Sequence, residues 1–111
     1  MKNRQTEFVT DQSAMKRAYG ERSKALQNRL SVLDEAENLA EVPHGPPDWL
    51  EQLKGDRDEQ FSVVLTGNWR LIFEVDQDPI PRRKDGGIDL DKVTAIRFLE
   101  VVDYHGKRSA R

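Results

Sequence analysis

The sequence predicts an α+β fold in which two N-terminal helices pack on a small antiparallel β-sheet. Three observations support this prediction: apolar residues recur with a helical period in the first half, the period changes to two near residue 61, and a tight-turn signal at Gly67-Asn68 separates two strand-like segments. Helices that precede a run of strands usually cover one face of the sheet, giving two layers. The opposite face is where we expect a functional site.

The helical part comes first. A weak strand signal at residues 7–9 precedes a short predicted helix over 11–19, which ends near Gly20. A longer helix is predicted over residues 21–40, because leucines recur at i, i+4 and i+7 and an alanine continues their stripe. The stripe consists of Leu26, Leu30, Leu33 and Ala36.

The strands follow a loop at residues 42–49, where three prolines and a glycine exclude regular structure. Residues 61–66 and 69–75 read as a β-hairpin, and 93–104 as a long final strand, with a loop over 76–92 between them. Alternation in the second hairpin strand gives two faces. One carries Trp69, Leu71, Phe73 and Val75, and the other Arg70, Ile72 and Glu74.

Composition limits the class of protein. The 111 residues suit a single domain over 1–111, with an inserted loop at 79–92 and a basic tail at 106–111. There is no cysteine, and no apolar run reaches the length of a membrane span or signal peptide. We therefore expect a soluble, cytoplasmic protein without a membrane partner.

Charge is unevenly distributed, although the net charge is only −2. Residues 1–33 hold seven basic and three acidic side chains, residues 34–60 hold two and nine, and residues 79–111 hold eight and five. The total argues against a polyanionic partner, but the local sign matters more for such binding.

Candidate functional residues gather at the end of the last predicted strand, in Asp103-Tyr104-His105. Histidine titrates near neutrality and can transfer a proton, and tyrosine can stack on a base. Taken alone, this trio is more often a polar strand terminus. Arg70 on the neighbouring hairpin and Lys54 before it are possible phosphate contacts, although both are commonly solvated charges. No spacing of histidines and carboxylates suggests a metal site, and no motif suggests a cofactor.

Several of these segments together resemble a known family. They are LKGDR at 53–57, GNWRLIF at 67–73 and VDYH at 102–105, and the resemblance spans roughly residues 20–105. The chain resembles the HigB-like host-inhibition (plasmid-maintenance killer) toxins of the RelE/ParE superfamily. This resemblance implies the RelE-like α+β fold and the toxin of a type II toxin–antitoxin pair.

The resemblance also implies an activity and partners. Relatives cut messenger RNA on the ribosome without a metal, and a cognate antitoxin neutralises them. For this chain we expect the antitoxin to be a helix-turn-helix protein, and we expect the toxin to contact DNA only through its complex with that antitoxin. Functional positions in the family correspond to Lys54, Arg70, Asp103, Tyr104 and His105. His105 then suits the acid–base role, while Arg70 and Lys54 suit stabilisation of phosphoryl charge.

Departures from the family pattern leave alternatives open. Glu51 stands where relatives often carry a histidine, and the loop before the last strand is longer than usual. Arg82, Arg83 and Lys84 in that loop are candidate RNA or antitoxin contacts. The first alternative is a catalytically degraded RelE-fold protein that binds an antitoxin or regulates. The second is a gyrase-poisoning relative, which would not need the terminal histidine.

Overall fold

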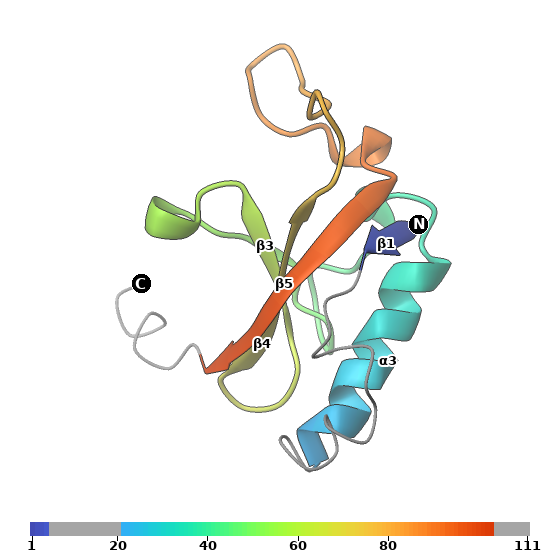
Figure 1. Ribbon diagram of the computed structural model, residues 1–111, viewed down its shortest axis with the longest axis vertical. Helices are drawn as coiled ribbons and strands as arrows, with labels where there is room; N and C mark the ends of the chain where they lie inside the picture. Colours follow the sequence, from blue (N-terminus) through green and yellow to red (C-terminus); the bar gives the residue numbers. More distant parts are fainter. Residues whose placement is uncertain (5–20, 104–111) are drawn as a thin grey trace.

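The computed structural model describes residues 1–4 and 21–103 (Figure 1). Five strands form one sheet in the order β1-β5-β4-β3-β2. Strand β1 pairs in parallel with β5, whereas the other three pairings are antiparallel. The strands are β1 (Lys2–Arg4), β2 (Glu51–Gln52), β3 (Gln60–Val64), β4 (Trp69–Val75) and β5 (Ala95–Asp103).

The sheet is therefore mixed, and the prediction of an antiparallel sheet was wrong for its β1 edge. Strand β1 consists of three polar residues, Lys2, Asn3 and Arg4, and none of them is fully buried. Such a segment has no alternation of apolar and polar residues, and so gives no strand signal. Its neighbour in the sheet lies more than ninety residues away, a pairing that local pattern cannot reveal.

One α-helix, α3 (Glu21–Glu35), lies within the described residues and packs beside the sheet (Figure 1). The shorter helix predicted at 11–19 and the strand predicted at 7–9 fall outside the described residues. Of the two predicted N-terminal helices, the described residues therefore contain only α3. The helix also ends before the predicted position at residue 40. Leu39 is fully buried in the 3₁₀ turn Leu39–Glu41, and its N–H donates to the Val93 carbonyl at 3.0 Å, which draws the chain away from the helix axis.

The predicted hairpin is confirmed by β3 and β4. Its turn is closed by a 2.9 Å hydrogen bond from Trp69 N–H to the Thr66 carbonyl, and Gly67 has a φ of 54° that suits glycine. The predicted apolar face of β4 packs in the main core, with Phe73 between two other rings. This core contains Leu26, Leu33 and Ala36 from the predicted helical stripe, and Phe61, Val63, Leu71, Phe73, Val75, Ile96 and Phe98 from the sheet.

A β-bulge in β5 sets which side chains reach the second face of the sheet. Phe73 pairs with Phe98 but Ile72 pairs with Glu100, so Leu99 is the extra residue. Strand alternation therefore restarts after the bulge, and Glu100 lies on the face opposite the main core. Glu100 there accepts a 2.7 Å hydrogen bond from Arg57, which also contacts Gln60. This bridge spans part of the second face.

The segment over 76–92 is more ordered than the predicted loop. Around its tip, Arg83 N–H donates to the Gly87 carbonyl at 2.7 Å and Asp89 N–H to the Pro81 carbonyl at 2.9 Å, forming a miniature hairpin. Ile88 is buried in the main core at the base of this hairpin. The segment ends in a 3₁₀ turn, Leu90–Lys92, before β5. It projects from the end of the sheet where β4 finishes (Figure 1).

Candidate functional site

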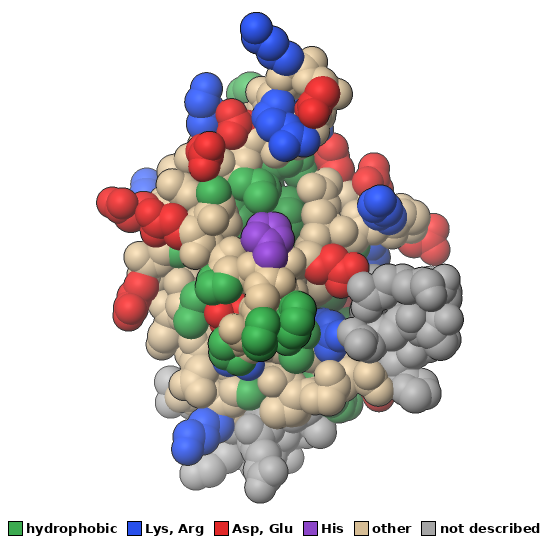
Figure 2. Space-filling model, turned by 180° about the vertical axis from the view of Figure 1, so that it is seen from behind, with side chains coloured by type: hydrophobic (Ala, Val, Ile, Leu, Met, Phe, Trp, Pro, Cys, Tyr) green, Lys and Arg blue, Asp and Glu red, His purple; other side chains and the backbone are tan. Residues whose placement is uncertain are grey.

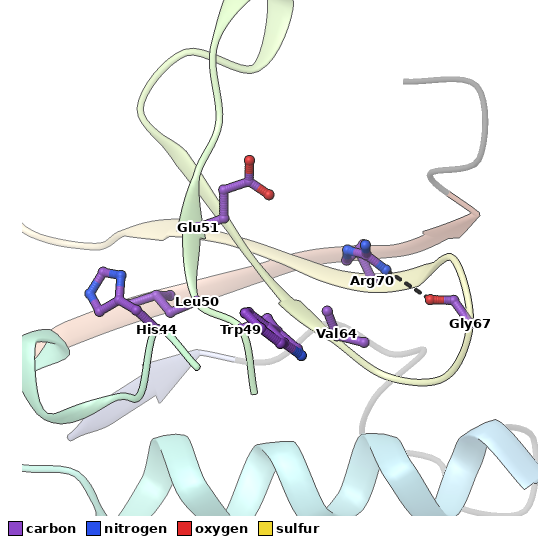
Figure 3. Close-up of a pocket in the computed structure, with 7 residues that line it drawn as sticks. All are labelled: His44, Trp49, Leu50, Glu51, Val64, Gly67 and Arg70. Atoms are coloured by element: carbon purple, nitrogen blue, oxygen red, sulfur yellow. Dashed lines mark hydrogen bonds between the residues drawn. The ribbon is translucent and has the colours of Figure 1, made fainter. Parts of the chain in front are cut away.

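An open pocket of about 720 Å³ lies on the second face of the sheet. Figure 3 shows Glu51 and Arg70 projecting to the same side of the sheet, with α3 on the other side. In Figure 2 the histidine of the described residues stands at the surface of this face, above a group of hydrophobic side chains. The pocket is lined by His44, Trp49, Leu50, Glu51, Val64, Gly67 and Arg70.

Arg70 is the most buried charged group of the pocket, with only 2% of its surface exposed. It lies on β4 opposite Val64 on one side and Val102 on the other. One guanidinium nitrogen donates to the Gly67 carbonyl at 3.2 Å and to the Trp69 carbonyl at 3.3 Å (Figure 3). These bonds fix the side chain against the hairpin turn, so the guanidinium is held in place before any ligand arrives. A held guanidinium is well suited to a phosphate.

The proline-rich loop forms one wall of the pocket and is tied to both layers. Asp48 is 4% exposed, and its carbonyl accepts from Val64 N–H at 2.8 Å. Its carboxylate lies 3.6 Å from the Nε of Arg29 on α3, and the same Nε donates to the Val64 carbonyl at 2.7 Å. Arg29 therefore joins the helix, the loop and the end of β3, and positions the residues that follow Asp48.

Glu51 enters the pocket from β2. It pairs with Ser62, which pairs with Ile72, which pairs with Glu100, so all four side chains lie on the second face. Leu53, two residues later, is buried outside the main core and anchors this short edge strand. The carboxylate is consequently carried by a paired strand, while His44 is carried by the loop that precedes it (Figure 3).

Two of the predicted site residues, Arg70 and Asp103, lie close together on the paired strands β4 and β5, but their side chains are on opposite faces of the sheet. Asp103 pairs with Trp69, directly beside Arg70 in sequence, so the end of β5 reaches the start of β4 as expected. The register, however, places Asp103 on the face of Trp69 and not on that of Arg70. Tyr104 and His105 fall outside the described residues, and their placement stays a prediction.

Lys54 does not line this pocket. It is exposed and precedes the 3₁₀ turn Gly55–Arg57, which begins at Gly55 with a φ of 66°. The LKGDR segment instead contributes Arg57, whose ion pair with Glu100 covers the adjacent part of the same face. The segment is therefore structural at Arg57 and open to solvent at Lys54.

The segment that carries the three loop cations, residues 82–84, lies beyond the end of β4 that is remote from Arg70 (Figure 1). Arg82 makes two hydrogen bonds to the Glu59 carboxylate, at 2.7 and 2.9 Å, and Arg83 lies 3.3 Å from a carboxylate oxygen of Asp85. Lys84 is exposed at the tip. The structure therefore does not bring these cations to the pocket, and two of the three are engaged by carboxylates.

Carboxylate pKa values in the loop region follow from these contacts. The hydrogen bond from Arg82 lowers the pKa of Glu59, and the backbone N–H of Gly87 lowers the pKa of Asp85. At the β1 edge, the hydrogen bond from Arg4 lowers the pKa of Asp76. All three carboxylates thus remain ionised at neutral pH and hold their arginine partners.

Two pocket residues, His44 and Trp49, were missed as site residues by the sequence reasoning. His44 was considered only as a metal ligand, and Trp49 only as part of a loop. The signal that could have found them is local: an imidazole between Pro43 and Pro46, and an indole two residues after Pro47, shortly before the strand that carries Glu51. Stiff loops that present such groups often carry function.

The pocket combines groups that can bind an anion and exchange a proton. Arg70 can hold a phosphate, while Glu51 and His44 are side chains of the types used in general acid–base catalysis. Within residues 1–4 and 21–103, no three histidine or acidic side chains cluster in a way that could hold a metal ion. In the same residues no helix is long and apolar enough to cross a membrane.

Comparisons with known proteins agree with this fold. The YoeB/ParE toxin from Agrobacterium tumefaciens is similar in structure, with a TM-score of 0.54 and 14% sequence identity, over 91% of this chain and 96% of that one. No curated protein sequence matches significantly. The model of the HigB-like toxins, described as RelE-like toxins of the type II toxin–antitoxin system HigB, matches residues 3–82. The chain therefore belongs to the HigB-like family of type II toxin–antitoxin toxins.

Proposed function

We propose that this toxin is a ribosome-dependent, metal-independent messenger RNA endoribonuclease that inhibits translation. The observation that carries the proposal is the setting of Arg70. Its guanidinium is buried, is fixed by two backbone carbonyls, and lines a pocket that also contains the Glu51 carboxylate and the His44 imidazole. These are the elements that cleavage of a ribose–phosphate chain requires.

The chemistry follows from the groups available. The ribose 2′-hydroxyl loses its proton to a base and attacks the adjacent phosphorus, while the bond from phosphorus to the 5′-oxygen breaks. The products are a 2′,3′-cyclic phosphate and a 5′-hydroxyl end. Glu51 is the base in this scheme, because a paired strand holds it on the face of Arg70.

The remaining roles rest on the family resemblance. His105 protonates the leaving 5′-oxygen and Tyr104 contacts the substrate. Arg70 neutralises the charge that gathers on the phosphoryl oxygens. Lys54, exposed on the approach to the same face, attracts the RNA backbone from outside the pocket. Asp103 orients its neighbours at the end of β5.

A type II toxin has an antitoxin partner, which follows from the family. We propose that this antitoxin is a helix-turn-helix protein and that the toxin meets DNA only through their complex, in the cytoplasm where ribosomes and messages are found. The loop at 76–92, rather than the pocket, is the proposed contact surface for such a partner, because it projects beyond the sheet and carries Lys84 at its exposed tip.

The second candidate is a catalytically degraded toxin that only binds its antitoxin. The acidic Glu51 in the pocket favours this reading, since a carboxylate repels RNA. The pairing of Arg82 and Arg83 with carboxylates favours it too, because it removes two cations from RNA binding. The two candidates differ in whether expression alone causes harm.

The test is growth of a bacterial culture after induction of the wild type, compared with an Arg70→Ala, His105→Ala double variant, and mapping of messenger RNA 5′ ends. An Arg83→Ala variant is the matched control, since it removes an arginine far from the pocket. The nuclease predicts arrest and new 5′-hydroxyl ends in translated messages for the wild type and the control alone. Equal growth without cuts, with all proteins folded, would establish the binding module, and arrest with DNA damage a gyrase poison.

A further inference from the structure

Trp49 is the one exposed large hydrophobic side chain among the described residues, with 50% of its surface accessible. Its φ is 49°, a left-handed backbone conformation that a bulky residue rarely adopts. Such a conformation persists only where the surrounding structure enforces it, and it is concentrated at functional sites. An exposed indole held in this way suggests a purpose beyond packing.

The surrounding loop enforces this conformation from both sides. Trp49 N–H donates to the Gly45 carbonyl at 2.8 Å, and Leu50 N–H donates to the Pro43 carbonyl at 3.0 Å. Asp48, the residue before Trp49, contacts β3 and Arg29, and Leu50, the residue after it, is buried in the core. The backbone at Trp49 is therefore fixed, and the indole is held at the surface.

The indole lines the same pocket as Arg70, and the close-up places Trp49 between His44 and Arg70 along one wall (Figure 3). Aromatic side chains beside a cation are the usual means by which proteins hold a single-stranded nucleotide: the base stacks and the phosphate is neutralised. Trp49 and Arg70, which line one pocket, together offer these two kinds of contact.

A peptide fits this pocket less well than a base. A peptide commonly binds a sheet by adding a strand to a free edge. Here the outer edge of β3 is already paired, by β2 at Ser62 and Phe61 and by the Asp48 carbonyl at Val64 N–H. The pocket therefore offers side chains, not a backbone ladder, to its ligand.

We propose that Trp49 is a stacking platform for an RNA base adjacent to the phosphate that Arg70 holds. The proposal rests on the proposed function and adds a base subsite to it. The loop places the indole, Arg70 holds the phosphate, and the two together fix the register of the strand in the pocket. Stacking is sequence-tolerant, so Trp49 supplies affinity and position, whereas base identity is read elsewhere.

The test uses purified protein and a short oligonucleotide in which every ribose is replaced by 2′-deoxyribose. Because the attacking 2′-hydroxyl is missing, this strand cannot be cleaved. Tryptophan fluorescence and anisotropy of a labelled strand are measured for the wild type, Trp49→Phe and Trp49→Ala. Trp69 remains in all three proteins and serves as an internal emission control. An oligonucleotide of the same length with abasic sites carries the phosphates without the bases.

The proposal predicts quenching in the wild type that is lost in Trp49→Phe while binding changes little, because phenylalanine still stacks. Trp49→Ala should bind about 10- to 100-fold more weakly. The abasic strand should bind all three proteins equally. Equal binding of the normal strand by wild type and Trp49→Ala would overturn the proposal, as would protection of Trp49 by the antitoxin and not by RNA.

Failure of the proposed function gives a different pattern. Stacking at Trp49 without any cleavage on ribosomes would keep the base subsite and remove the nuclease. Cleavage at an unchanged rate by Trp49→Ala would keep the nuclease and remove the subsite. Thermal unfolding of each variant shows whether a negative result reflects lost folding.

Discussion

Arg70 lies near the start of β4 and Arg82 in the loop that follows the other end of this strand, and both were predicted from the sequence to bind phosphate. Arg70 is 2% exposed and donates to two backbone carbonyls of its own hairpin, facing a pocket. Arg82 is at the surface and donates twice to the carboxylate of Glu59. The two carbonyls of the hairpin fix the position of the Arg70 guanidinium, whereas the carboxylate of Glu59 offsets the charge of Arg82.

This difference shows that a cation is informative only together with its partners. Glu59 lies in the turn just before β3, more than twenty residues before Arg82, so no local pattern reveals the pair. A strand period, by contrast, revealed that Arg70 shares a face with Ile72. The same residue type is therefore a candidate ligand at one end and a structural contact at the other.

The largest expected effect is on the rate of RNA cleavage, and it follows from a change at Glu51 in the pocket. Glu51→Gln keeps the size of the side chain but removes its basicity, so cleavage on ribosomes should slow by about 100-fold or more. Glu35→Gln on α3 removes the same charge far from the pocket and should cleave normally. Both rates are measured in a purified translation reaction. A Glu51→Gln variant as fast as the wild type would exclude Glu51 as the base.

An intermediate effect concerns the loop that forms the pocket wall. Arg29→Met leaves the buried carboxylate of Asp48 without its cation, and should lower the free energy of unfolding by about 3 kcal/mol. Lys24→Met, an exposed change on the same helix, should have little effect. Adding Asp48→Asn to Arg29→Met should recover part of the loss, because an amide is cheaper to bury than a charge. Denaturant unfolding measures all three; equal stability of Arg29→Met and wild type would contradict the account.

The smallest expected effect is on thermal stability, and it follows from a change at Glu59, the partner of Arg82 in the loop. The pKa of Glu59 is lowered in the folded protein by the hydrogen bond from Arg82, so the pair stabilises the fold above the unfolded pKa of about 4.3 and loses that stabilisation as pH falls through the lowered value. Glu59→Gln should therefore melt slightly below the wild type at pH 7, and the gap should close in acid. A gap that widens in acid would reverse the sign of this argument.

Much of the fold could be predicted because it depends on local periodicity. The leucine stripe of α3, the hairpin around Gly67 and the two faces of β4 are all readable from residues a few positions apart. The mixed sheet was not predictable, because its parallel strand is three polar residues long. The end of α3 was missed for a similar reason. The helix ends before Leu39, whose N–H donates to the carbonyl of Val93, a partner far along the chain.

The candidate site divides in the same way. Arg70 was found from its strand position, and Glu51 was noticed as a departure from the family. The Asp103 register depends on the bulge at Leu99, which no pattern in the sequence marks, so its placement opposite Trp69 was not foreseen. Trp49 was passed over because exposure and a positive φ belong to the folded loop and not to its composition.

The most direct test of the central claim compares the two ends of β4 in one experiment. Cleavage of a defined message on purified translating ribosomes is timed for the wild type, Arg70→Lys, and a triple loop variant, Arg82→Gln, Arg83→Gln and Lys84→Gln, after thermal unfolding confirms that each is folded. The account predicts that Arg70→Lys is at least about 100-fold slower, since a lysine lacks the planar fork, while the triple variant stays within about threefold of the wild type. A fast Arg70→Lys together with a slow triple variant would place the RNA contacts on the loop and contradict the account.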